Sequence, residues 1–100
     1  MNTNNIDKMT KRLKRICEKQ FKQITIIVNN IITYKVKDKN IIEHTLDSLL
    51  DLTYMVDTKT IYYKLLNYWK HINLESANDY ENFYLEIIAE DENYTLKRQK

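Results

Sequence analysis

The sequence contains neither glycine nor proline, whereas an average chain of this length carries roughly seven and five of them. Without glycine, backbone conformations with positive φ are costly, and the glycine-based tight turns of β-hairpins are excluded. Without proline, nothing forces a break inside a helix. Both absences favour helices and disfavour an all-β or α/β fold.

Cysteine occurs once, at Cys17, which excludes an internal disulfide and a cysteine-rich metal cluster and fits a reducing compartment. Long apolar runs are also missing, so the sequence predicts no membrane span. The first residues, MNTNNIDKMTKRLKR, lack the apolar stretch of a signal peptide. We therefore expect one cytoplasmic helical domain over residues 1–100, with frayed ends at about 1–4 and 95–100.

Ile, Asn, Lys and Tyr are abundant in the chain, and alanine is scarce. Glycine, proline and alanine have GC-rich codons, while the four abundant residues have AT-rich codons. The composition therefore indicates an AT-rich genome, such as that of a low-GC bacterium, a phage or a large virus. A viral protein of this kind would act in the host cytoplasm.

Residues 23–37 decide the fold class, because they are rich in β-branched residues and suit either a β-hairpin or a helix. A two-residue turn at Asn29-Asn30 would put Thr33 and Lys35 on the apolar face of the hairpin, so the two strands do not match. A three-residue loop restores the match by pairing Val28 with Ile32, but it gives up the simple turn signal. A helix at 100° per residue keeps one apolar side without a slip. That side carries Ile6, Met9, Leu13, Ile16, Cys17, Phe21, Ile24, Ile27, Val28, Ile31 and Tyr34.

We therefore predict a long helix over roughly residues 5–36, with an α+β fold containing a hairpin at 23–37 as the alternative. Ile24, Ile27, Val28 and Ile31 should be buried in this helix. Ile26 and Ile32 point away from the apolar side and should be more exposed, or should face another chain.

The second helix is predicted to follow the connection DKN, with Asn40 and Glu43 as a capping pair. Its apolar side carries Ile42, Leu46, Leu49, Leu52 and Val56. After Val56 the apolar phase jumps by about half a turn, which places a helix break at VDTKT. Asp57 or Thr58 is the expected N-cap of the third helix.

The third helix is predicted to run to about Asn73, and LESAND forms the next connection with Ser76 as a cap. The fourth helix has an apolar stripe at helical spacing, formed by Tyr80, Phe83, Tyr84, Ile87 and Ile88. The fold class that follows is an all-α bundle of about four helices with a long N-terminal helix. Part of that long helix either packs along the others or overhangs and is covered by a second copy.

Catalytic motifs are missing, since the chain has no phosphate-binding loop, nucleophile elbow or HExxH sequence. His44 and Asp47 share a helical face at i, i+3 spacing, but solvated acidic faces produce such pairs by chance. We expect no catalytic residues, no metal site, no cofactor and no small-molecule substrate.

The strongest candidate for a binding surface is basic. Lys8, Lys11, Arg12, Arg15, Lys19 and Lys22 share one side of the first helix, opposite its apolar side. Residues 1–40 carry ten Lys/Arg and three Asp/Glu, a net charge of +7, while residues 41–100 carry six and eleven, a net charge of −5. The basic side suits an acidic protein or duplex phosphates, or it is neutralised by the chain's own acidic half.

A second candidate surface consists of apolar residues that do not fit their helical stripes. These are Ile26, Ile32, Tyr54, Met55 and Tyr63. Exposed tyrosine and methionine are typical of protein interfaces. Local bending near the expected helix break explains the last three residues equally well.

Taken together, these features favour a non-enzymatic helical binding protein. We expect an inhibitor or regulator of phage, viral or mobile-element type that occupies a macromolecular partner. The alternative is a nucleic-acid-binding protein that uses the basic side of the first helix, with a homodimer presenting two such helices.

Overall fold

The chain folds into four helices without a strand in the part that the computed structural model describes, which is the backbone of residues 3–99 and the side chains of residues 6–90. The helices are α1 (Thr3–Thr33), α2 (Lys39–Leu52), α3 (Lys59–Lys70) and α4 (Leu74–Gln99). The predicted all-α bundle with a long N-terminal helix is confirmed. The alternative with a hairpin at 23–37 is wrong, because those residues continue α1 up to Thr33.

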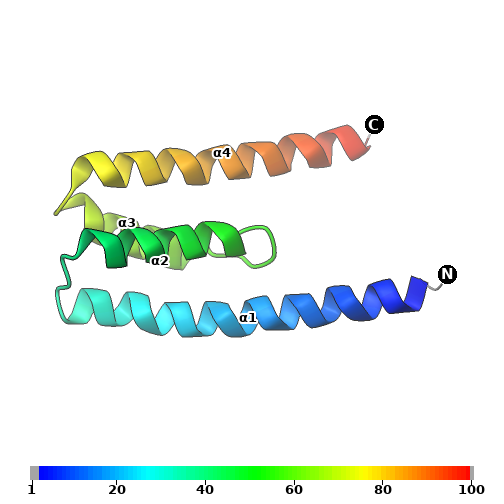
Figure 1. The fold of residues 1–100 in the computed structure, drawn as a ribbon. Coiled ribbons are helices and arrows are strands. Elements are labelled where there is room, and N and C mark those ends of the chain that lie inside the picture. Colours follow the sequence, from blue (N-terminus) through cyan, green and yellow to red (C-terminus); the bar gives the residue numbers. More distant parts are fainter. Residues whose placement is uncertain (1–2, 100) are drawn as a thin grey trace.

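The four helices form three layers (Figure 1). α2 and α3 lie side by side in the middle layer, α1 covers one side of that layer, and α4 covers the other. α1 contacts α2 and α3, and α4 contacts α3 and α2, while the described residues include no contact between α1 and α4. The middle helices are therefore buried on two faces.

The core follows from this layering. Its buried side chains come from all four helices and are Val28, Ile31, Ile42, Leu46, Leu49, Leu50, Tyr62, Leu65, Leu66, Trp69, Ala77 and Tyr84. α1 contributes only Val28 and Ile31 to this set, both from the half of the helix that faces α2 and α3. The core thus lies at one end of α1, and the other end extends past the loop between α2 and α3 (Figure 1).

α1 ends earlier than residue 36, because Lys35 adopts a left-handed conformation with φ of 54°. The Val36 N–H donates to the Ile31 carbonyl (2.9 Å), and the Lys35 N–H donates to the Ile32 carbonyl (3.3 Å). These two bonds form a Schellman motif, in which the left-handed position is usually glycine. Since the chain has no glycine, a lysine takes this position at a conformational cost.

Replacing Lys35 with glycine should raise the free energy of unfolding by about 0.5–1 kcal/mol. The relief of about 1–2 kcal/mol of left-handed strain exceeds the extra entropy that glycine gives the unfolded chain. Urea unfolding followed by circular dichroism measures the change. Lys37→Gly is the matched control, because Lys37 lies outside the left-handed region and should not be stabilised by glycine. An equal gain in both variants would contradict the role of Lys35.

Two predicted helix caps are wrong. α2 is capped by Asp38, whose Oδ1 accepts from the Ile41 N–H at 3.2 Å, and not by Asn40 with Glu43. α4 begins at Leu74, because the Oδ1 of Asn73 accepts from the Ser76 N–H at 3.0 Å. Ser76 is therefore inside α4, and LESAND is not a connection.

The break between α2 and α3 begins earlier than predicted, because α2 ends at Leu52 and Val56 lies outside it. Thr58 is the N-cap residue of α3, as predicted. The Thr58 side chain makes no capping bond; its hydroxyl instead lies 2.7 Å from the Thr53 hydroxyl. The neighbouring Asp57 Oδ1 accepts from the Lys59 N–H at 3.2 Å. α3 ends at Lys70, three residues before the predicted end.

Candidate binding surface

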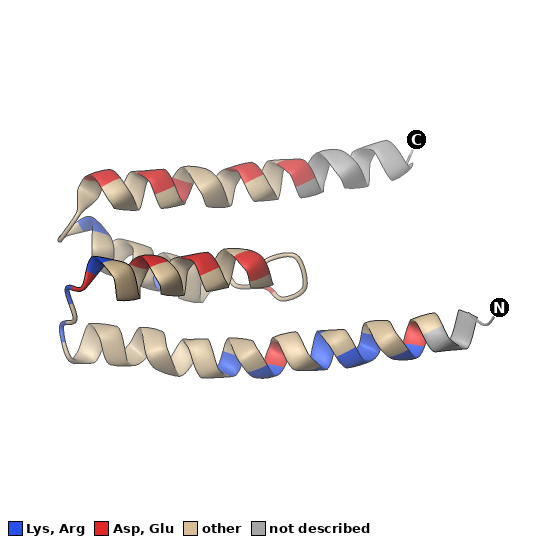
Figure 2. Ribbon diagram, in the orientation of Figure 1, with Lys and Arg blue, Asp and Glu red and all other residues tan. Residues whose placement is uncertain are grey.

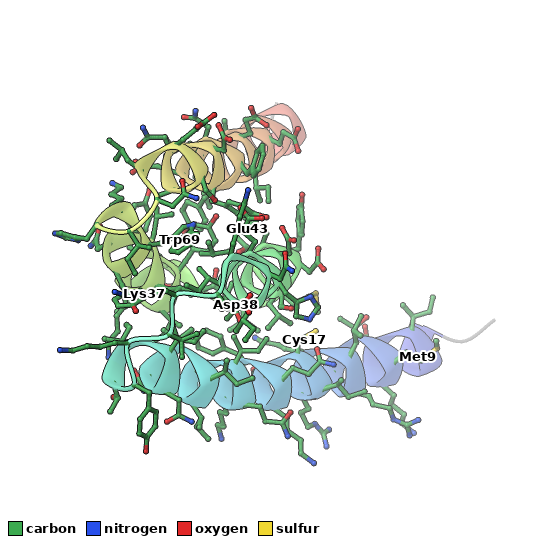
Figure 3. All side chains as sticks on the ribbon, turned by 60° about the vertical axis from the view of Figure 1, so that its left-hand side comes forward. Met9, Cys17, Lys37, Asp38, Glu43 and Trp69 are labelled. Atoms are coloured by element: carbon green, nitrogen blue, oxygen red, sulfur yellow. The ribbon has the colours of Figure 1, made fainter. Side chains whose placement is uncertain are left out.

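The first half of α1 is exposed from Ile6 to Ile16, so it does not pack closely against another helix in the described part of the chain. The last turn of α2 lies beside residues 20–27 of α1, where Ser48, Asp51 and Leu52 line a groove together with Gln20, Gln23, Ile24 and Ile27. α2 ends at Leu52, so residues 3–16 of α1 continue past it. We call this segment the N-terminal arm. Figure 3 shows Met9 on it, remote from the labelled core residue Trp69.

The arm carries four apolar side chains that the described residues leave about half exposed or more. Ile6, Met9, Leu13 and Ile16 are 52%, 70%, 51% and 47% exposed. Together with Thr10 and Arg12 they line a shallow groove along the arm. We call the four residues the apolar stripe. The predicted apolar side of α1 is thus only partly core, since burial begins at Cys17.

The six basic residues predicted from the sequence are all exposed. Lys8, Lys11, Arg12, Arg15, Lys19 and Lys22 lie on the outer side of α1. Figure 2 shows them gathered in the first half of α1, whereas the acidic residues gather on α2 and α4. We call the six residues the basic face.

The basic face is not neutralised by acidic side chains of α2 and α4 in the described part of the chain. The one ion pair found there joins Lys70 Nζ to Glu81 Oε1 at 3.1 Å, between α3 and α4. The acidic residues of α4 lie across the middle layer from α1, and the described residues of the two helices are not in contact. The prediction of an asymmetric charge distribution therefore holds in three dimensions.

The apolar residues predicted as an interface differ in how far they are buried. Ile26 and Tyr54 are exposed, and Met55 is half-buried. Ile32 and Tyr63 instead pack against the core, and the Tyr63 ring meets Tyr84 edge-on with centroids 5.5 Å apart. Ile32 is therefore not the exposed residue that the apolar phase predicted, although Ile26 is.

Ile27 also departs from its prediction. It was expected in the core and is 45% exposed, because it faces the groove beside the last turn of α2. Val28 and Ile31 are buried as predicted, and Ile24 is half-buried. The exposed Ile26 lies on the same side of α1 as Lys8 and Arg15, at the end of the basic face.

A polar network between α2, α3 and α4 was missed by the sequence analysis. The Ser76 hydroxyl donates to Glu43 Oε2 at 2.5 Å and accepts from Trp69 Nε1 at 2.9 Å. Figure 3 shows Glu43 and Trp69 close together between these helices. The partners are 33 residues apart for the first bond, so no local pattern could have revealed it. The buried Ser76 hydroxyl thus has a donor and an acceptor partner, and the three residues have a structural role in connecting α2, α3 and α4.

In the described residues, no three His, Cys, Asp or Glu side chains lie close enough together to bind a metal ion. His44 and His71 are exposed, and Cys17 is buried. In the part of the chain that the structure describes, every helix is too short or too polar to cross a bilayer.

Comparison of the chain with protein-family models, with curated proteins and with solved structures finds no match.

Proposed function

We propose that this chain is a non-enzymatic binding protein whose basic face docks onto an acidic surface of another protein. In this proposal it acts as an inhibitor or regulator that occupies its partner, in a phage, viral or mobile-element setting that the AT-rich composition favours. The observation that carries the proposal is the exposure of all six basic side chains on one side of α1, without an ion pair among the described residues.

The geometry of α1 supports a fixed docking surface. The residues from Lys8 to Lys22 extend about 21 Å along one uninterrupted helix. Six cations held at this spacing create a positive field that speeds encounter with an acidic partner and orients it. Glu18 is the only acidic residue between them, so the field has one sign over most of this length.

Charge reversal tests the proposal. The variant carries Lys11→Glu, Arg12→Glu, Arg15→Glu and Lys19→Glu, and the chain is used as bait in lysate of a low-GC bacterium, with captured proteins quantified by mass spectrometry. The wild type should retain an acidic protein that the variant loses by at least about tenfold, because each cation at the contact is replaced by a repelling charge.

The matched control reverses four exposed lysines elsewhere, as Lys35→Glu, Lys37→Glu, Lys39→Glu and Lys59→Glu. It changes the net charge by the same amount and should retain the partner. If the basic-face variant captures the same proteins as the wild type and the control, the proposed docking surface is wrong.

Duplex nucleic acid is the second candidate partner, favoured by the linear arrangement of the cations. Phosphates of a duplex supply one negative charge per about 1.7 Å of axis, which a straight 21 Å row can follow. Fluorescence anisotropy with a labelled duplex would distinguish the two partners. If nucleic acid is the partner, log affinity falls with log salt at a slope of about −0.9 per phosphate contact, and the basic-face variant loses binding.

A further inference from the structure

We draw no further inference here: the strongest candidate, the apolar stripe of Ile6, Met9, Leu13 and Ile16 on the first half of α1, is exposed, and nothing in the structure shows what covers it.

Discussion

Replacing Trp69 with alanine should lower the free energy of unfolding by about 3–5 kcal/mol, because the change leaves a large cavity in the core. Trp69 is 1% exposed and belongs to the cluster built from all four helices. Its indole N–H also donates to Ser76, whose hydroxyl bonds to Glu43. The alanine variant removes both the packing of the indole ring and the hydrogen-bond donor to Ser76, which connects α3 to α4. Urea unfolding measured by far-UV circular dichroism gives the change.

A milder substitution separates the two contributions of Trp69. Trp69→Phe keeps most of the apolar contact and removes the N–H donor, so it should cost less than Trp69→Ala, with about 1–3 kcal/mol from the bond left unmade. Tyr54→Ala is the control, because Tyr54 is exposed and its loss should stay within about 0.5 kcal/mol. A cost below about 1 kcal/mol for Trp69→Ala would show that Trp69 does not anchor the core.

The helices could be predicted from the sequence because each carries its own apolar period. The phase jump alone indicated the break before α3 and its N-cap residue Thr58. It placed the end of α2 too late, since that helix already ends at Leu52. The other two caps were misplaced, since Asp38 and Asn40, or Asn73 and Ser76, are equally good cap residues by type. Which one caps depends on where the chain turns to bring the helices into contact, and that is a property of the whole bundle.

Burial along α1 was harder to predict than the helix itself. The pattern identifies an apolar side, but it does not say how far α2 and α3 extend along it. α2 ends at Leu52, so the stripe residues are exposed although they continue the same side as Val28. Tyr63 was predicted to be exposed because it lies outside the apolar stripe of α3, yet it packs against the core. α3 is covered on two faces, so more than one stripe of its residues is buried.

The basic face was predictable as a set of residues, because helical spacing places them together. Whether the acidic half of the chain neutralises it was not predictable, since that depends on which helices touch. The layering keeps α4 away from α1 among the described residues, and this arrangement comes only from the three-dimensional structure. The residues of the basic face can therefore be read from the sequence, whereas their exposure to a partner depends on how the helices pack.

Raising the pH above about 10 should destabilise the protein through tyrosines that the fold keeps protonated. Tyr62 is fully buried, and its hydroxyl donates to the Tyr80 carbonyl at 2.6 Å. Burial, with smaller contributions from neighbours such as Tyr80, raises the pKa of Tyr62 far above its usual value of 10.0. Burial, with the nearby Asp47 carboxylate, also raises the pKa of Tyr80.

The sign of the effect follows from which state releases the proton. Below pH 10 the hydroxyl of Tyr62 is protonated in both the folded and the unfolded chain, and its contribution to stability is fully present. Above that pH the unfolded chain ionises while the folded chain does not. Stability then falls by up to about 1.4 kcal/mol per pH unit for each such group.

Tyr62→Phe isolates this effect. The variant loses the bond to the Tyr80 carbonyl and should be about 1 kcal/mol less stable than the wild type at pH 7. Its loss of stability between about pH 10 and 11.5 should be shallower by up to about 1.4 kcal/mol per pH unit, because phenylalanine cannot ionise in the unfolded chain. Urea unfolding at several pH values measures both slopes, and the remaining titrating groups are common to the two proteins. Tyr54→Phe, which alters an exposed ring, should keep the wild-type slope. Equal slopes for Tyr62→Phe and the wild type would mean that the buried hydroxyl ionises as readily in the folded chain as in the unfolded one.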